Sequence, residues 1–271
     1  MRTTLYRYPH ERLILALTLF LVMAVVALTA SATICASGIF IIAYVAISAY
    51  FGYAHHQSLV RSARRITPKD MPELAEIVHR GMTRLKPGQV EVYALSNPEL
   101  NAYTFGLSSP KVVVLYSRLF QVMDADEILF ILGHELGHVA LGHTWLNSLV
   151  GGIAGIPSSW SAGSLLTMAF LWWNRACEYS ADRAGMLACG KPEKAVSALI
   201  KLVAGPHANT SLALERAYQQ IDAEDDTLMG ILYESLSSHP MLIRRIQELR
   251  QYATSSQFRH LAGQMNGLKE N

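Results

Sequence analysis

The stretch from His134 to His138, which reads HELGH, lies inside an apolar, helix-like run from Glu127 to Leu141. Residues four apart lie on one face of a helix, so His134 and His138 can direct two imidazoles at one point. Polar groups are costly to bury without partners, and a shared metal ion would remove that cost. The pattern therefore predicts half of a metal site, with Glu135 beside it as the base that activates a water molecule.

A catalytic zinc site generally has a third protein ligand and an open fourth position. Glu178 is the predicted third ligand, and Asp182, one helical turn later, is predicted to accept the spare N–H of a ligating imidazole. His143 follows His138 by five residues, whereas the elongated zincin pattern requires six, so His143 is predicted to be structural or to support a metal ligand from behind. The alternative for Glu178 and Asp182 is that they are solvated charges on a surface helix. Two imidazoles and one carboxylate fit a single Zn²⁺ per chain best.

A second constraint is the uncharged run of 42 residues from Leu13 to Ala54. One bilayer crossing takes about 20 residues, so the run predicts two transmembrane helices at about 13–31 and 35–53, within an anchor over 1–60. Basic residues flank it on both sides, which places both ends in the cytosol. The alternatives are a cleaved signal peptide over 1–32, since Ala30-Ser31-Ala32 resembles a cleavage site, and a soluble core hairpin.

Composition agrees with a membrane protein, because 51% of the residues are hydrophobic and only 16% are charged, against about 25% charged in soluble proteins. The net charge of +2 is too small to indicate binding to nucleic acid. Cys35, Cys177 and Cys189 are too few for a disulfide framework. Cys177, next to Glu178, is predicted to be a small buried side chain, with a fourth metal ligand or a redox-sensitive thiol as alternatives.

The remaining domain, 61–271, is predicted to be mainly α with a small antiparallel β-sheet. A helix over about 70–85 precedes three short segments rich in β-branched and aromatic residues: Val90 to Leu95, Ala102 to Phe105 and Val112 to Tyr116. An edge strand of such a sheet can hold an extended peptide through main-chain hydrogen bonds. A sheet without any substrate contact is the alternative.

The uncharged stretch from Thr144 to Asn174 has 31 residues, whereas two crossings take about 40. Pro157 divides it into two short arms, so a re-entrant or membrane-seated hairpin is predicted at about 145–173. Two buried helices of a soluble domain are the alternative. The chain beyond Arg175 is predicted to be helical, with an amphipathic helix at about 211–236, a last helix after Pro240 and a tail from Ser255 that frays.

These motifs together resemble the HtpX-type membrane zinc metalloproteases, whose relatives include the CAAX prenyl endopeptidases and the Oma-type proteases. The HELGH stretch and the later Glu178-x-x-x-Asp182 carry the resemblance first. It extends from about Glu99 to Leu249 through Asn101-Ala102-Tyr103, Ser238-His239-Pro240 and Arg245-Ile246. The two leading apolar segments also match the HtpX layout.

The resemblance implies a zincin-type fold and a role for each matching residue. The implied zinc ligands are His134, His138 and Glu178, with Glu135 as the general base and Asp182 orienting a ligand. His239 is implied to be catalytic, by stabilising the oxyanion of the tetrahedral intermediate. The implied substrate-binding residues are Arg245, which positions the substrate or the site, and Asn101, Ala102 and Tyr103. The second hydrophobic region is shorter than is usual for HtpX-like chains, and the CAAX enzymes have more membrane helices than this chain can supply, so prenyl-protein processing is not expected.

We therefore expect a multi-pass, zinc-dependent endopeptidase of the cell (inner) membrane, with its catalytic domain on the cytosolic side. The expected partners are the lipid bilayer and misfolded or damaged membrane proteins as substrates. One alternative is a maturation protease that cuts a single partner. Another is a zinc-stabilised membrane adaptor or chaperone without catalysis, although such a protein would not need Glu135 beside an open coordination position.

Overall fold

The computed structural model describes residues 5–32, 36–106, 108–150, 161–205, 208, 210–212, 215–216 and 242–267. The protein is mostly helical with one small sheet, as expected. Its elements are α1 (Glu11–Ala32), α2 (Ala36–Ser62), β1 (Arg64–Arg65), α3 (Pro72–Leu85), β2 (Val90–Leu95), β3 (Ala102–Phe105), β4 (Lys111–Tyr116), α4 (Leu119–Val122), α5 (Ala125–Leu141), α6 (His143–Val150), α7 (Ser161–Cys189), α8 (Pro192–Ala204), α11 (Leu242–Thr254) and α12 (Ser256–Gly267).

The sheet is mixed, and in this the prediction of an antiparallel sheet is wrong. Its strand order is β1-β2-β4-β3, with β1 antiparallel to β2, β2 parallel to β4, and β3 antiparallel to β4. The three predicted segments do form strands. β3 follows β2 in the sequence but does not pair with it. Instead β4 lies between β2 and β3 in the sheet and runs parallel to β2. Strand propensity does not specify which strands are neighbours.

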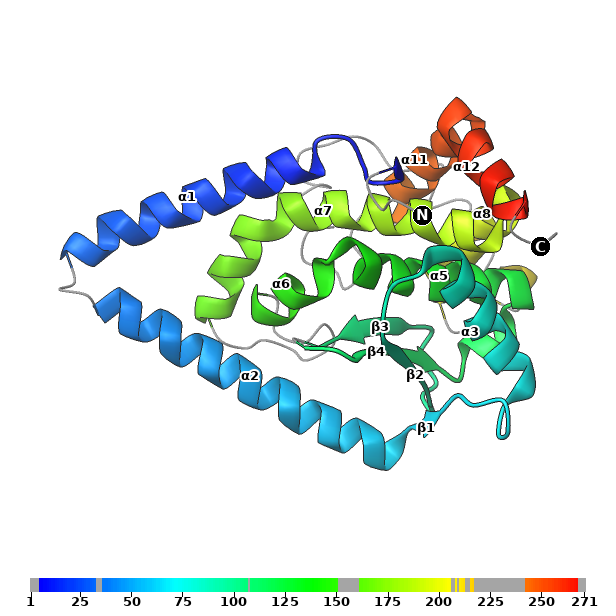
Figure 1. Ribbon diagram of the computed structural model, residues 1–271, viewed down its shortest axis with the longest axis horizontal. Helices are drawn as coiled ribbons and strands as arrows, with labels where there is room; N and C mark the ends of the chain where they lie inside the picture. The colour runs from blue at the N-terminus through cyan, green and yellow to red at the C-terminus, as the bar shows by residue number, and fades with distance from the viewer. Residues whose placement is uncertain are drawn as a thin grey trace.

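Helix α5 lies at the centre of the fold, with α7 on one side and the sheet on the other (Figure 1). A capping box starts it: the Asp124 carboxylate accepts from the backbone N–H of Glu127, and Glu127 Oε2 accepts from the Asp124 N–H at 2.8 Å. Gly142, at φ 81°, ends it in the left-handed region that favours glycine. Between these ends nearly every side chain of α5 is buried, including both histidines of the HELGH stretch.

Close packing brings α7 against α5. An added Cβ at Gly133 would lie 2.5 Å from Ala188 Cβ, and one at Gly137 would lie 2.7 Å from Ala184 Cβ. On the facing helix, a Cβ at Gly185 would lie 2.7 Å from the Phe130 carbonyl oxygen. Only small residues at these crossings permit so short an interhelical distance, which brings the polar residues of the two helices together.

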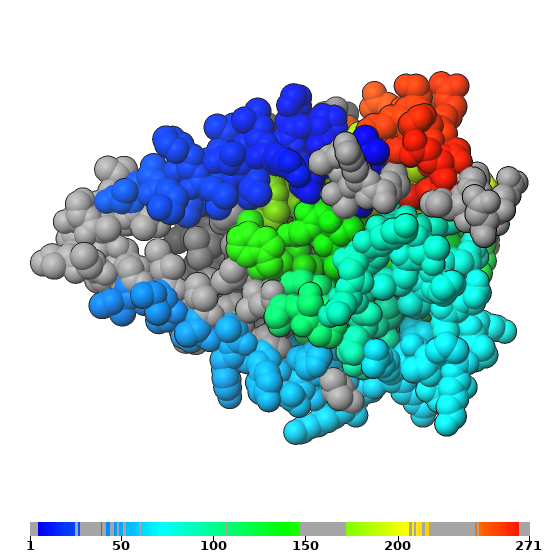
Figure 2. Space-filling view, in the orientation of Figure 1, coloured from blue at the N-terminus to red at the C-terminus, as the bar shows by residue number. Residues whose placement is uncertain are grey.

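Helices α1 and α2 comprise the two leading apolar segments and form the long sides of a wedge (Figures 1 and 2). α6 and the first part of α7 lie between them (Figure 1). α1 packs on α7, and Leu59 of α2 packs against Tyr103 and Phe105 of the sheet. Large exposed apolar side chains are concentrated on these two helices: Leu13, Leu17, Leu19, Phe20, Leu21, Met23, Ile39, Ile42, Ile47, Tyr50 and Tyr53. Within the described residues, no helix reaches the combination of length and apolarity that a membrane crossing needs.

In the second apolar stretch the described residues form α6 and the first part of α7, and the hairpin at about 145–173 stays a prediction. Residues 151–160, including Pro157, lie outside the described part. Trp145 and Trp172 are exposed, whereas Trp173 is buried beside Leu146 and Cys177.

The C-terminal part also has the predicted helices where the structure describes it. α11 begins at Leu242, shortly after Pro240, while most of the predicted helix at 211–236 lies outside the described residues. The prediction that the tail frays from Ser255 is wrong for residues 256–267, which form α12 and bury Phe258, Leu261 and Met265, spaced three and four residues apart, against the core.

Candidate metal centre

α5 directs the imidazoles of His134 and His138 to the same point, as their spacing predicts. The two Nε2 atoms are 3.1 Å apart, and each residue is 7% exposed. α7 supplies Glu178, whose Oε1 lies 3.3 Å from His138 Nε2 and whose Oε2 lies 3.5 Å from His134 Nε2. The Glu178 side chain is 28% exposed, so one side of this cluster opens to solvent.

His134, His138 and Glu178 are spaced as three ligands of a tetrahedrally coordinated metal ion. Their ligand atoms all lie within 4.8 Å of one another. A zinc ion with bonds of about 2.0–2.1 Å holds its ligand atoms about 3.3 Å apart, which matches the separations of 3.1, 3.3 and 3.5 Å. Two imidazole nitrogens facing each other at 3.1 Å also need a proton or a cation between them, because otherwise their lone pairs would be in contact.

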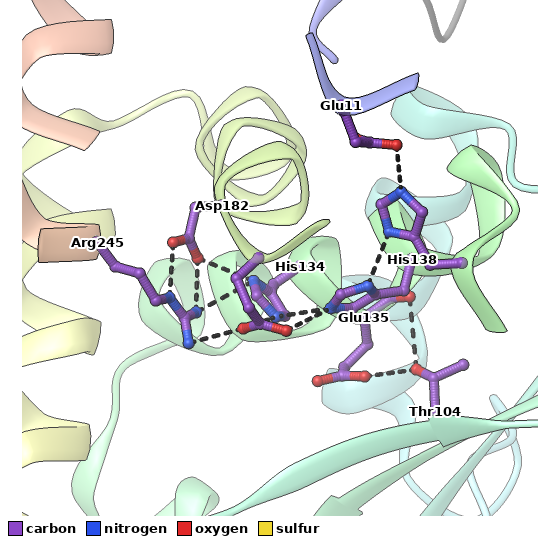
Figure 3. Close-up of polar contacts among 9 residues, drawn as sticks. Glu11, Thr104, His134, Glu135, His138, Asp182 and Arg245 are labelled. Carbon is purple, nitrogen blue, oxygen red and sulfur yellow. Dashed lines mark hydrogen bonds and ion pairs between the residues drawn. The ribbon is translucent and has the colours of Figure 1, made fainter. Parts of the chain in front are cut away.

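Nδ1 of His134, the nitrogen that faces away from the common point, contacts the buried carboxylate of Asp182. The position of Asp182 one helical turn after Glu178 predicts this contact. His134 Nδ1 lies 2.9 Å from Asp182 Oδ1. Arg245 of α11 donates to both oxygens of Asp182, at 2.7 and 2.8 Å, and its Nη1 lies 2.8 Å from Glu178 Oε2 (Figure 3). Arg245 is only 4% exposed. Of the two roles that the resemblance allowed, these contacts favour positioning the site over binding the substrate.

This arginine also sets the charge state of the two carboxylates. Burial alone would raise the pKa of Glu178, but Arg245 and the two imidazoles hold that pKa well below its ordinary value. The pKa of Asp182 is lowered in the same way, with burial opposed by Arg245 and His134. Both carboxylates are therefore anionic at neutral pH, as a metal ligand and an acceptor of an imidazole N–H must be.

Glu135 is adjacent to the first ligand and points toward the sheet. Thr104 of β3 donates a hydrogen bond of 2.5 Å from its hydroxyl to Glu135 Oε2 (Figure 3). β3 is an edge strand, since it pairs only with β4 within the described residues. The contact therefore places this edge beside the carboxylate.

The predicted substrate strand coincides with β3. Asn101 lies just before it, and its side chain accepts from the backbone N–H of Ala102 at 2.9 Å. Tyr103 turns its side chain away from the cluster, toward α2, where its hydroxyl lies 3.1 Å from His55 Nε2. Any contact of Tyr103 with a peptide would therefore use its backbone.

Comparison with known proteins gives the family. The model for peptidase family M48 matches residues 68–253, which is more than half of the chain. The chain belongs to peptidase family M48. The match spans α3 to α11 and so includes every member of the cluster described above.

Curated relatives named as proteases and as a metallopeptidase support the resemblance to HtpX-type proteases. Plastoglobule-localized metallopeptidase 48, chloroplastic, of Arabidopsis thaliana is 28% identical over 190 residues, which cover 65% of this chain and 55% of that protein. Protease HtpX of Xanthomonas oryzae pv. oryzae is 28% identical over 212 residues, 65% of this chain and 71% of the relative. Protease HtpX of Shewanella pealeana is 29% identical over 224 residues, 68% and 76% respectively. This chain thus spans about half the length of the first relative.

Two further residues lie behind the ligand candidate His138. His143 supports that imidazole, in agreement with the prediction, whereas Glu11, outside the range that the family model matches, was not predicted. His138 Nδ1 lies 3.0 Å from His143 Nδ1, and His143 Nε2 lies 3.1 Å from Oε1 of Glu11, in the first turn of α1. Burial raises the pKa of Glu11, but hydrogen bonds from His143 and Ser180 and the charge of Arg7 outweigh it and lower that pKa overall. The available signal was a lone acidic residue two positions before the uncharged run that begins at Leu13.

Two further predictions concern residues near the cluster of His134, His138 and Glu178. His239 lies outside the described residues, so its predicted role stays a prediction. Cys177 is buried at 1% exposure beside Leu146 and Trp173, as expected of a small core side chain, and it is not among the three converging donors. Burial raises the pKa of its thiol well above the ordinary value.

Proposed function

We propose that this M48 peptidase is a membrane-anchored, zinc-dependent endopeptidase with His134, His138 and Glu178 as its metal ligands. The observation that carries the proposal is the convergence of two Nε2 atoms and one carboxylate at separations of 3.1–3.5 Å, beside Glu135. Asp182 and His143 occupy the Nδ1 sides of the two imidazoles, which leaves both Nε2 atoms directed at the common point.

The residues divide the chemistry among them. A zinc ion held by these ligands would polarise the scissile carbonyl and increase the acidity of a water molecule. Glu135 accepts a proton from the attacking water and then delivers it to the leaving amine nitrogen. Thr104 donates to Glu135 Oε2 and so orients the carboxylate. His239, which the described residues do not include, keeps the oxyanion-stabilising role that the resemblance implies.

The substrate is proposed to be a protein chain held in extended form along β3. The free edge of β3 offers backbone N–H and C=O groups beside Glu135, and a peptide can add to such an edge as a further strand. Sequence-tolerant binding of this kind suits a protease that degrades misfolded or damaged membrane proteins.

Anchoring is proposed to use α1 and α2, multi-pass in the cell membrane, with the peptidase domain on the cytosolic side. Contiguous exposed apolar surface is uncommon on soluble proteins and marks contact with a membrane or a partner. Large exposed apolar side chains are concentrated on these two helices, and basic residues stand at their outer ends, including Arg12 in the first turn of α1 and Arg61 in the last turn of α2. The arms at about 145–173 are proposed to seat on the same bilayer, with Trp145 and Trp172 exposed as interface residues.

The test is cleavage of an unfolded protein by the full chain purified in detergent. We expect casein fragments, loss of cleavage after treatment with a chelator, and recovery when zinc alone is added. A chain that binds zinc but cuts neither casein nor itself would be an adaptor or a narrow maturation protease. Proteomics of a deletion strain separates broad quality control, which stabilises many proteins, from maturation, which leaves one precursor uncut.

A further inference from the structure

A line of polar contacts connects the start of α1 to the second ligand imidazole. Glu11 Oε1 lies 3.1 Å from His143 Nε2, and His143 Nδ1 lies 3.0 Å from His138 Nδ1 (Figure 3). All three side chains are buried, with Glu11 and His143 only 1% exposed. On the opposite side of the cluster, Asp182 makes the corresponding contact directly with His134 at 2.9 Å.

The positions of the protons along this line follow from the contacts. If His138 Nε2 binds a metal ion, the ring proton of the neutral imidazole must be on Nδ1. His143 Nδ1 can then only accept that proton's hydrogen bond, so the ring proton of His143 is on Nε2. A carboxylate oxygen accepts but does not donate when ionised, and Glu11 Oε1 is the atom that faces this N–H.

Glu11 is itself held in place by the segment around it. The Arg7 guanidinium pairs with the Glu11 carboxylate, and its Nη2 donates to the Leu141 carbonyl at the end of α5 at 2.9 Å. Ser180 of α7 donates to Glu11 Oε2 and accepts from the backbone N–H of Tyr8 at 2.7 Å. Glu11, His143 and Cys177 also lie close enough to hold a cation, but the Arg7 guanidinium already neutralises this carboxylate.

We infer that Glu11 is a positioning residue for the metal centre, which acts through His143 to hold His138 with Nε2 directed at the ion. The inference rests on the proposed metal site. Carboxylates that orient a ligating imidazole through its second nitrogen raise its basicity and fix its ring. Here the same effect passes through one intervening imidazole. Glu11 lies before residue 68, outside the range that the M48 family model matches, so the first apolar helix contributes to the site.

The test measures zinc affinity of the full-length protein in detergent, by competition with a chromogenic chelator. Glu11→Leu removes the acceptor with little change in volume, and we expect zinc binding to weaken about 10–100-fold. Glu11→Gln keeps an oxygen acceptor and is expected to bind zinc more tightly than Glu11→Leu. In a His143→Leu background, Glu11→Leu should cause no further loss of affinity.

The matched control is Glu127, an equally buried glutamate at 1% exposure on α5. It pairs with Lys201 at 2.7 Å and accepts from Ser197 at 2.6 Å, much as Glu11 pairs with Arg7 and accepts from Ser180. Glu127→Leu should lower the thermal stability and leave zinc affinity unchanged.

Two results would overturn the inference while leaving the proposed function intact. One is a wild type that binds zinc and cleaves casein while Glu11→Leu and Glu11→Gln both keep wild-type zinc affinity. The other is an equal loss of affinity in Glu127→Leu and Glu11→Leu, which would show a general loss of structure. A wild type without zinc affinity would instead overturn the proposed function.

Discussion

The carboxylate of Asp182 lies 2.9 Å from Nδ1 of His134, one turn of α7 after Glu178. A single helix thus carries both the third donor of the cluster and the group that orients the first. The close α5–α7 crossing makes this possible, because Gly133 and Gly137 have no side chains of their own to hold the helices apart. The geometry of the cluster therefore depends on helix packing as much as on the ligand residues.

Arg245 fixes the two carboxylates of α7 relative to each other through a planar, forked group. Arg245→Lys keeps the positive charge but cannot reach both oxygens of Asp182 and also Glu178. We expect zinc affinity to fall about 10–100-fold, because the carboxylates lose their fixed orientation. Chelator competition on the purified variant measures this.

A buried arginine away from the cluster provides the control for that variant. Arg84 of α3 is 9% exposed and donates to the Ala188 carbonyl oxygen. Arg84→Lys should retain the zinc affinity of the wild type. Unchanged affinity in Arg245→Lys would contradict the positioning role.

The glycines of α5 set the distance to α7, so a single methyl group should separate the two helices. In Gly137→Ala the new Cβ would lie 2.7 Å from Ala184 Cβ, closer than real contacts allow. We expect the free energy of unfolding to fall by about 1–3 kcal/mol, as in other overpacked cores, together with weaker zinc binding. Gly263→Ala on α12 meets open space and should be neutral or slightly stabilising. Equal stability of the two variants would argue against the close crossing.

The hydroxyl of Thr104 is predicted to orient the general base. Thr104→Val keeps the shape of the side chain and removes the hydrogen bond to Glu135 Oε2. A bond to a charged group contributes about 1.5 kcal/mol or more, so kcat for a peptide substrate should fall about tenfold while zinc content stays at one ion per chain. Thr104→Ser should restore most of the rate. A serine variant as slow as the valine variant would point to packing instead.

The lowered pKa of Glu11 predicts an acid-sensitive contribution to stability. Its folded-state pKa is below the ordinary 4.5, so its ionised form is favoured by folding. The stabilisation is therefore fully present above about pH 4.5 and is lost as the pH falls through the folded-state value. Measured without metal, the melting temperatures of wild type and Glu11→Gln should differ at neutral pH and converge on acidification. A difference that stays constant from pH 7 to pH 3 would contradict the lowered pKa.

The sequence predicted those features that depend on nearby residues. The spacing of His134 and His138 determined their common face, and the three strands were located because β-branched residues cluster between turn formers. The pairing of Glu178 and Asp182 with the histidines was a reasonable expectation only because i, i+4 spacing repeats on a second helix and because the motifs together resemble one family.

Features that depend on distant residues were not accessible in this way. The parallel pairing of Val92 with Val113 follows from the spatial order of the strands, in which β4 lies between β2 and β3, and strand propensity does not encode that order. Glu11 reaches His143 across 132 positions without any periodic pattern to connect them. Thr104 likewise contacts Glu135 only because α5 packs on the sheet.

The most direct test of the central claim is the zinc content and casein cleavage of three proteins measured together: wild type, Glu135→Gln and Glu178→Ala. We predict about one zinc ion per chain in wild type and Glu135→Gln, and little in Glu178→Ala, because only the last loses a ligand. Only the wild type should cleave casein at an appreciable rate, and Glu135→Gln should be slower by at least about a hundredfold. Cleavage by Glu135→Gln at the wild-type rate, or full zinc content in Glu178→Ala, would contradict the account.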